Sequence, residues 1–409
     1  MSHARPCLVR QHKRHEQPVP ETCPLCRLFT TNRKYNLLWG GDGNVSPAPI
    51  AKPLSKADRI RLRFKLPTFA ELDRRRAVCE GCEYFKVGGS GLKRCSHGKG
   101  CGCGGTLPTT CPLDKWDTLT PEVLVKFDQT NLFPNAVPGY RLNPSILVWQ
   151  DGYLFVFRDG WKDSNLWLAK LDRGLRPTLC HLLQLSHPRC SYGREDPRIW
   201  LFNGRPHVSF TGVQIKNGGM KTHVLYARLG EDLQVEQLAT PRYKDRRPWE
   251  KNWGFFQHGD DLLAVYSIGP KHRVIRMNGD QVEVVSETDC FPWNGGEPRG
   301  GAPPIRVGDE YWNFFHDRVH DEGGIAIYRA GLYTFETNPP FKPLRYIPKP
   351  IAVGDVETKK LTNHCDAAFY PAGTIHEGDR WLVSAGEHDR WSTIVSYSHK
   401  VLEKHLVKV

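Results

Sequence analysis

Opposite charges are concentrated in the segment Arg194-Glu195-Asp196-Pro197-Arg198, immediately before an apolar run. A carboxyl group in such a cluster can transfer a proton in catalysis if its surroundings set a suitable pKa. Burial and a neighbouring carboxylate raise that pKa, whereas flanking arginines lower it, so the residue types alone leave the balance open. The segment is equally consistent with an Arg–carboxylate network that braces a turn.

A second set of chemically versatile side chains lies near the N-terminus, where nine of the 13 cysteines precede residue 112. Cys7, Cys23 and Cys26, with His12 and His15 between them, offer three thiolates and a choice of imidazole. A C-x2-C pair presents two thiolates to one ion, and a tetrahedral zinc needs four such ligands. The first cluster therefore predicts zinc held by Cys7, Cys23, Cys26 and one histidine. We expect that histidine to be His12.

The next cysteine cluster is denser and rich in glycine, which permits the sharp turns that thiolate ligation requires. Its run CSHGKGCGCGGTLPTTCPLDKW resembles small CxxC…CGC…CP-x-x-x-W modules of bacterial and phage proteins. Six thiolates exceed the needs of one zinc, so either two stay free or the site is more elaborate, with an iron–sulfur cluster among the options. Because no spacing matches the common ferredoxin patterns, structural zinc is the prediction. The expected ligands are Cys79, Cys82, Cys95, Cys101, Cys103 and Cys111.

The net charge of +13 is concentrated in the N-terminal region, where residues 1–117 hold 21 Lys/Arg against 10 Asp/Glu. Two short basic helices are expected at 56–65 and 68–76, on either side of Pro67. Such a region can bind nucleic acid, another polyanion or a protein partner, and it can equally be a solvated linker. We therefore expect a basic metal-binding region at 1–117.

The remaining features indicate an intracellular, cytoplasmic protein without a membrane segment. No apolar run approaches the roughly 20 residues that cross a bilayer, and the polar start lacks a signal-peptide core. An odd number of cysteines without a secretion signal argues against a disulfide framework. Cys180, Cys190, Cys290 and Cys365 are expected to be buried as small hydrophobic residues.

From residue 130 onward, short runs of β-branched and aromatic residues alternate with Gly and Pro, which predicts an all-β region at 130–409. A turn followed by alternating apolar residues recurs five times, at 151–160, 203–212, 259–269, 308–317 and 378–389. Since a blade of four strands fills about 40–50 residues, these repeats predict a five-bladed β-propeller. The repeat ends, among them Arg158, His316 and Asp389, should converge on one pocket.

The order of short motifs across residues 140–398 resembles that of the family 130 glycosidases. The motifs are LNPSI with Asn143, REDPRIW with Asp196, EKNW with Asn252, GGAPPI at 300–305, FFHD with His316, FYPAG at 369–373 and SAGEHD with Asp389. The resemblance implies an inverting five-bladed-propeller enzyme, in most members a β-mannoside phosphorylase, related in fold to β-mannosyltransferases. Asp196 corresponds to the family's general acid.

The resemblance also assigns the surrounding residues, and it implies no metal or other cofactor in the chemistry. Sugar-binding positions are expected at Asn143, Arg158, Glu195, Arg198, Asn252 and Asp389. Inorganic phosphate is the expected co-substrate, and its anionic oxygens call for cationic or polar partners. These are expected at Lys251, Arg299, His316 and Arg318.

Several positions depart from the phosphorylase pattern. Arg299 precedes the proline-rich motif in place of a lysine, Asp317 follows the histidine, and the last motif carries Glu387. The additional acids would repel phosphate, or one of them would serve as the base of an inverting hydrolase, with Glu297 as a third candidate. The sequence thus predicts a mannoside phosphorylase or hydrolase, with a mannosyltransferase and a non-catalytic glycan-binding propeller as alternatives.

Overall fold

The computed structural model divides the chain into two compact units, Met1–Thr118 and Leu119–Val409. It describes residues 119, 121–127, 142–160, 163–216, 219–322, 324–354 and 367–409, with the strands at 85–87 and 93–95. In the first unit, β1 (Phe85–Val87) and β2 (Lys93–Cys95) pair as an antiparallel hairpin. The helices expected at 56–65 and 68–76 and the side chains of all ten expected metal ligands lie outside the described residues.

Three sheets of the second unit each contain four antiparallel strands that follow one another in the chain. The first contains β4 (Leu142–Trp149), β5 (Gly152–Arg158), β6 (Leu166–Leu171) and β7 (Pro177–Leu182). The short 3-10 helix η2 (Pro188–Cys190) leads to the second, which contains β8 (Gly193–Phe202), β9 (Arg205–Lys216), β10 (Gly219–Leu229) and β11 (Val235–Ala239). The third contains β12 (Gly254–His258), β13 (Asp261–Ser267), β14 (Lys271–Asn278) and β15 (Gln281–Asp289).

The remaining strands form two more groups of four, joined by a short parallel pairing of β18 with β21. The fourth group contains β16 (Ile305–Val307), β17 (Glu310–His320), β18 (Ala326–Glu336) and β19 (Pro343–Tyr346), with β20 (Ala352–Val353) beside β18. The fifth contains β21 (Ala367–Glu377), β22 (Arg380–Glu387), β23 (Trp391–Ser398) and β3 (Glu122–Phe127). The helix α5 (His399–His405) and β24 (Val407–Lys408) follow, and β24 pairs with β19.

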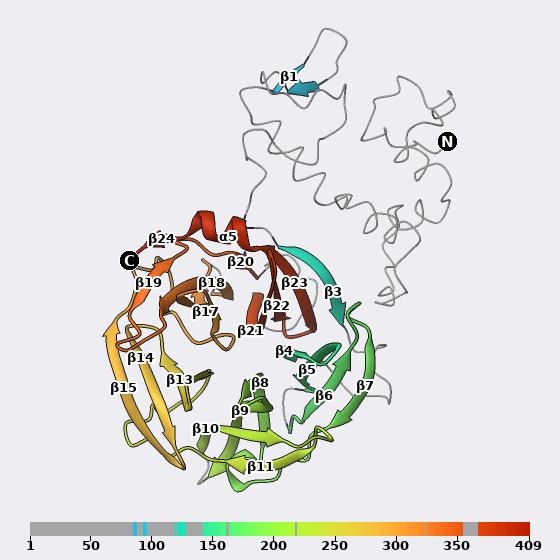
Figure 1. Cartoon of the computed structure of the whole chain (residues 1–409), viewed down its shortest axis with the longest axis vertical. Coiled ribbons are helices and arrows are strands. Elements are labelled where there is room, and N and C mark those ends of the chain that lie inside the picture. Colours follow the sequence, from blue (N-terminus) through green and yellow to red (C-terminus); the bar gives the residue numbers. More distant parts are fainter. Residues whose placement is uncertain are drawn as a thin grey trace, which may run out of the picture. The chain divides into compact units, whose positions relative to one another are not determined.

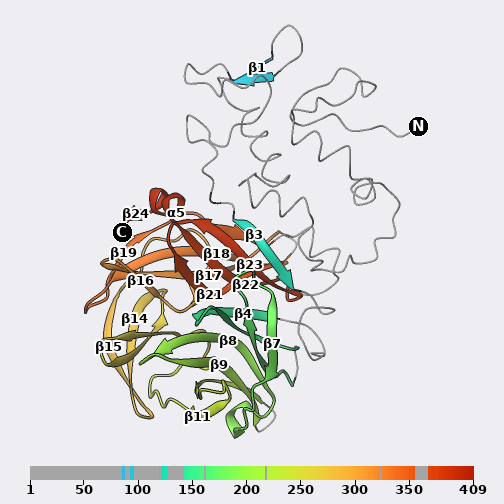
Figure 2. The ribbon, with the colours of Figure 1, turned by 45° about the vertical axis from the view of Figure 1, so that its right-hand side comes forward.

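The groups succeed one another around a common centre, with β7, β11 and β15 on the outside and β4 and β8 nearer the middle (Figures 1 and 2). The predicted all-β class and propeller-like architecture are confirmed. Each of the five repeats falls on a turn and on the second strand of a group; these strands are β5, β9, β13, β17 and β22.

Buried side chains fill the space between successive groups. Trp200 of β8 stacks on Phe255 of β12 with ring centroids 5.0 Å apart, which joins the second and third groups. Between the fifth and first groups, Phe127 of β3 meets Phe155 of β5 edge to face at 5.3 Å. Every neighbouring pair of groups therefore shares an apolar interface, and the ring closes through them.

Strand β3 completes the fifth group because it pairs antiparallel with β23, from Ser392 opposite Phe127 to Ser396 opposite Glu122. It lies before residue 130, the start expected for the β region, so the described sheet extends further toward the N-terminus. Of the scattered cysteines, Cys180 and Cys190 are buried as expected, Cys290 is half-buried, and Cys365 lies outside the described residues.

No helix among the described residues has both the length and the apolar character to span a lipid bilayer.

Candidate active site

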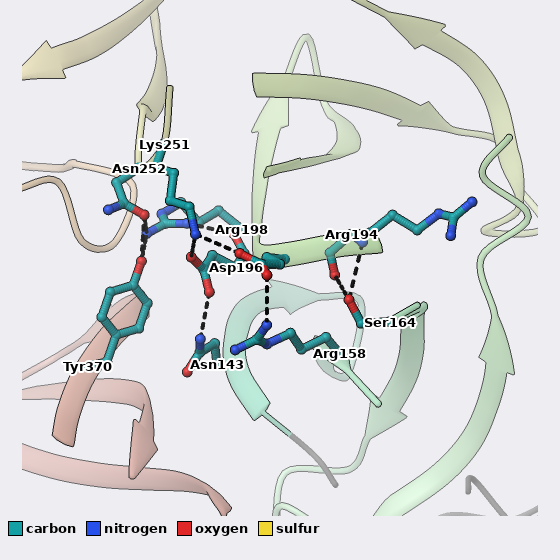
Figure 3. Close-up of polar contacts among 10 residues, drawn as sticks. Asn143, Arg158, Ser164, Arg194, Asp196, Arg198, Lys251, Asn252 and Tyr370 are labelled. Atoms are coloured by element: carbon teal, nitrogen blue, oxygen red, sulfur yellow. Dashed lines mark hydrogen bonds and ion pairs between the residues drawn. The ribbon is translucent and has the colours of Figure 1, made fainter. Parts of the chain in front are cut away.

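Irregularities in two inner strands turn the first site residues toward each other. The pairing register shifts within Leu142–Ser145 of β4 and within Glu195–Arg198 of β8. Each shift contains a proline. Proline has no N–H to donate, and at a bulge the strand pairing does not need that hydrogen bond. Asn143 and Asp196, the residues before those prolines, have φ of 49° and 53°, a left-handed conformation that Asn and Asp tolerate best after glycine. As a result, Asn143 Nδ2 donates to Asp196 Oδ1 at 2.6 Å (Figure 3).

Asp196 is 7% exposed and is surrounded by positive charge. Burial raises the pKa of its carboxyl group, but Lys251, whose Nζ is 3.9 Å from Asp196 Oδ2, and Arg158 lower it. Arg198 and the hydrogen bond from Asn143 lower it further, so that the resulting pKa is about 2. The sequence left this balance open, and the structure resolves it in favour of the cations. Asp196 is a carboxylate at neutral pH in the unliganded site.

A second carboxylate, Glu195, is held by the same cations. Lys251 Nζ donates to Glu195 Oε2 at 2.6 Å, and an Arg158 Nη is 3.6 Å from Glu195 Oε1. Burial of Arg158 lowers the pKa of its guanidinium group, but Asp196, Glu195 and Asp389 outweigh burial and raise it. Asp389, with φ of 49° after β22, thus belongs to the same electrostatic environment. The two interpretations of the charged segment therefore apply together, because the candidate catalytic carboxylate is itself part of the Arg–carboxylate network.

Arg198 connects the inner segments of several groups and is 2% exposed. Its guanidinium donates to the Gly301 carbonyl at 2.5 Å and to the Asp196 carbonyl at 2.6 Å. It also donates to Asn252 Oδ1 at 3.1 Å and to the Tyr370 hydroxyl at 2.5 Å. Arg198 and Asn252, both expected to bind sugar, are thus joined to each other and to Tyr370 by hydrogen bonds (Figure 3).

Tyr370 is a site residue that the sequence did not single out. Its hydroxyl donates to Asn252 Oδ1 at 2.7 Å while it accepts from Arg198. It lies in the FYPAG motif, where the β21–β22 register shifts between Pro371 and Gly373. A polar residue followed by proline on an inner strand is thus the signal shared by Asn143, Asp196 and Tyr370.

His316 lies at the same centre, with its ring 4.5 Å from the ring of Tyr370. Burial, Arg198 and Arg299 lower the pKa of its imidazole to about 3. It is therefore neutral at neutral pH, so it would meet an anionic ligand as a polar hydrogen-bonding group and not as a cation. His316 Nδ1 is buried and has no hydrogen-bond partner among the described residues, so this nitrogen is suited to a hydrogen bond with a ligand.

Arg299 and Arg318, the two arginines expected to bind phosphate, are near His316. Arg299 and His316 exchange backbone hydrogen bonds of 2.8 and 3.1 Å. The Arg318 guanidinium lies over the ring of Tyr328, at 5.7 Å, and that ring stacks on His316 at 5.9 Å. Arg299 thus adjoins His316 through the backbone, and Arg318 adjoins it through Tyr328; their part in binding phosphate stays a prediction.

Asp317, one candidate hydrolytic base, is fully buried and serves as a structural anchor. Its carboxylate accepts from Trp293 Nε1 at 2.8 Å and from the Gly296 N–H at 2.9 Å, and it forms an ion pair with Arg329. These contacts fix the loop that carries Trp293 and Gly296. With its side chain fully buried and both oxygens engaged, Asp317 is less suited to binding a water molecule than an exposed carboxylate would be.

The other two candidate bases are also paired with cations. Glu387 binds Lys126 of β3 at 2.8 Å and accepts from the Thr393 hydroxyl at 2.8 Å. Glu297 is exposed and lies 3.4 Å from Arg247. Both carboxylates are therefore engaged by other side chains of the protein.

Comparisons with known proteins support the fold. Neither a protein-family model nor a curated protein matches the chain. Among solved structures it is similar to a β-1,2-mannobiose phosphorylase from Listeria innocua, with TM-score 0.51 and 15% identity, over 68% of this chain and 96% of that chain. It is also similar to a candidate glycoside hydrolase from Parabacteroides distasonis, with TM-score 0.50 and 15% identity, over 65% and 88% of the two chains. The chain therefore shares the propeller-like β fold of these two proteins.

Proposed function

We propose that the propeller-like unit is a carbohydrate-active enzyme that acts on glycosidic bonds of β-mannosides, with inorganic phosphate as co-substrate. The observation that carries the proposal is Asp196, a buried carboxylate that accepts a hydrogen bond from the Asn143 amide and lies in the field of Lys251, Arg158 and Arg198. The likeness of the fold to a mannobiose phosphorylase is consistent with it.

In this proposal Asp196 exchanges one proton with the bridging oxygen. In phosphorolysis, phosphate attacks the anomeric carbon, the glycosidic C–O bond breaks, and Asp196 gives its proton to the leaving oxygen. In synthesis, the acceptor hydroxyl attacks mannose 1-phosphate, phosphate leaves, and Asp196 accepts the hydroxyl proton. Because a bound phosphate offsets nearby positive charge, it raises the pKa of Asp196 and so favours the protonated form that phosphorolysis requires.

Phosphorolysis is supported over hydrolysis. An inverting hydrolase places a second carboxylate about 6.5–9.5 Å from the acid to activate water. The three candidates for that role are each held in an ion pair. The cations beside Asp196 and the neutral His316 instead suit an anionic co-substrate.

Mannosyl transfer is the second candidate function, and the low pKa of Asp196 favours it. A carboxylate that is ionised before substrate binds is ready to accept a proton from an acceptor hydroxyl. A glycosyltransferase of this kind would use an activated sugar donor in place of inorganic phosphate.

The decisive experiment is incubation with a panel of β-mannosides, with and without phosphate, and with mannose 1-phosphate plus acceptor sugars. We expect phosphate-dependent release of mannose 1-phosphate, and Asp196→Asn should lower turnover by about 10²–10⁴-fold while the protein stays folded. Release of free mannose without phosphate would indicate hydrolysis. Full activity of the Asp196→Asn variant, or no turnover of any sugar, would refute the catalytic proposal and favour a glycan-binding propeller.

We further propose that the N-terminal cysteine clusters hold structural zinc. Thiolate pairs at C-x2-C spacing support this, because they match the ligand arrangement of structural zinc sites. Metal analysis of the purified full-length chain tests it, and the absence of stoichiometric zinc would refute it.

A further inference from the structure

Three large apolar side chains are exposed together at one rim of the second strand group. Ile215 of β9 is 51% exposed, Met220 of β10 is 50% exposed and Trp249 is 57% exposed. Ile215 lies directly opposite Met220 in the hairpin, so both side chains project from the same face. Trp249 forms an isolated bridge with Thr222, two residues beyond Met220. We call these three residues the rim surface.

The segment that carries Trp249 is anchored from inside the protein. Glu250 is 4% exposed and accepts hydrogen bonds from Trp253 Nε1 and the Tyr266 hydroxyl, both at 2.9 Å, and from the Arg247 N–H. On one side of this anchor, Lys251 reaches Glu195 in the candidate site. On the other side, Trp249 is exposed to solvent. The indole is thus presented by a fixed backbone, which lowers the entropy lost when a ligand binds.

Strand register gives the distance of the rim surface from the candidate site. Trp249 pairs with Thr222, Thr222 with Val213, and Val213 with Gly193, the first residue of β8. Three strand spacings place the Trp249 backbone about 14 Å from Gly193. Gly193 precedes Glu195 and Asp196 on the same strand, so the rim surface lies at a comparable distance from the candidate site. A sugar bonded at Asp196 cannot span that distance, whereas an oligosaccharide can.

The composition of the rim surface indicates an uncharged ligand. Arg246 and Arg247, which precede Trp249 in the chain, are already engaged, because Arg246 donates to the Thr222 carbonyl at 2.7 Å and contacts His223, and Arg247 pairs with Glu297. The exposed Lys216 and Lys221 adjoin Ile215 and Met220, but side chains alternate along a strand, so these lysines project from the opposite face of the hairpin. A flat indole beside aliphatic side chains suits the apolar face of a sugar ring. Three residues are also far fewer than the about 20–30 that each partner contributes to a stable protein interface.

We propose that the rim surface is a distal binding site for an uncharged oligosaccharide, in which Trp249 stacks on a sugar several units away from the bond held at Asp196. This inference rests on the proposed function and adds to it a preference for long substrates.

The test compares the wild type with Trp249→Ala and Trp249→Phe on β-manno-oligosaccharides of increasing length. In Trp249→Ala, kcat/KM for long chains should fall about tenfold relative to that for the disaccharide, because the contact with the distal sugar is lost while the contacts near Asp196 are kept. Trp249→Phe should recover part of the loss. Val284→Ala, which truncates an exposed side chain on the outer strand β15, is the matched control and should leave the length dependence unchanged.

The outcomes separate this inference from the proposed function. If the wild type turns over mannosides and Trp249→Ala does not change the length dependence, the rim inference is wrong and the proposed function stands. If no glycoside is turned over, calorimetric titration with the same oligosaccharides tests the rim surface alone. In that case, weaker binding of long chains to Trp249→Ala supports the inference, and equal or undetectable binding in both proteins overturns it.

Discussion

Asp196 shows how a buried carboxyl group can be ionised at neutral pH despite its burial. Its low pKa depends on cations contributed by other segments, with the contribution of Lys251 ahead of that of Arg158. The family resemblance singled out these side chains in the sequence as candidates for phosphate and sugar binding. The sign of the pKa shift was not readable from the sequence, because it depends on distances of a few ångströms between groups far apart in the chain.

Replacing Lys251 by methionine should change the pH dependence of the reaction. Removal of the strongest favourable charge should raise the pKa of Asp196 from about 2 toward its ordinary value. In the synthetic direction the carboxylate form is required, so the rate of Lys251→Met should fall as the pH drops from about 5 to about 3, where the wild-type Asp196 stays mostly ionised. The measurement is the pH profile of kcat/KM with mannose 1-phosphate and acceptor.

The control for that experiment is Lys271→Met, which removes an exposed lysine paired with Asp289. Its profile should match that of the wild type. A Lys251→Met profile that also matches the wild type would show that Lys251 does not set the ionisation of Asp196.

At the scale of elements, the site depends on the close approach of strands that belong to different groups. Gly386 of β22 lies against Asn143 of β4, and a Cβ at Gly386 would be 2.0 Å from Asn143 Oδ1. The absence of a side chain at this position allows Asn143 to reach Asp196.

Gly386→Ala should therefore impair catalysis more than folding. The added methyl group displaces the Asn143 amide from Asp196, and overpacking of this kind costs about 1–3 kcal/mol. Turnover and the urea midpoint of unfolding should be measured together. Gly219→Ala is the control, because the nearest atom to a Cβ there is 3.7 Å away; a Gly386→Ala enzyme as active as this control would contradict the role assigned to the glycine.

The repeats could be predicted from local sequence patterns. The place of β3 in the sheet could not, because its partner strand is far away in the sequence. A turn followed by alternating apolar residues is visible within ten residues, and each instance fell on a hairpin. The six residues of β3, EVLVKF, have a recognisable strand composition, but their partner β23 lies at 391–398. The bulges at Asn143 and Asp196 were hidden for the same reason, since a register shift is a property of two strands together.

At the scale of the whole molecule, the ring has interfaces between all neighbouring groups, and β3 provides one side of the last interface. Phe127, 1% exposed, lies in the core between the fifth and first groups. Lys126 of the same strand pairs with Glu387 of β22. Both apolar and polar contacts therefore hold the strand in place.

A chain that begins at Leu119 should fold cooperatively, while one that begins at residue 130 should not. The shorter chain lacks β3, exposes the edge of β23 and loses the packing of Phe127 on Phe155. Circular dichroism and thermal unfolding of the two purified fragments provide the comparison. Equal thermal midpoints would show that β3 is dispensable for ring closure.

The pairing of β3 with β23 also bears on biosynthesis. Residues 122–127 leave the ribosome long before residues 391–398. During this time β3 is part of the nascent chain but its partner strand β23 has not been synthesised. Assembly of the ring is completed only after translation of the intervening strands, and during that interval chaperones that bind extended apolar peptides have access to β3.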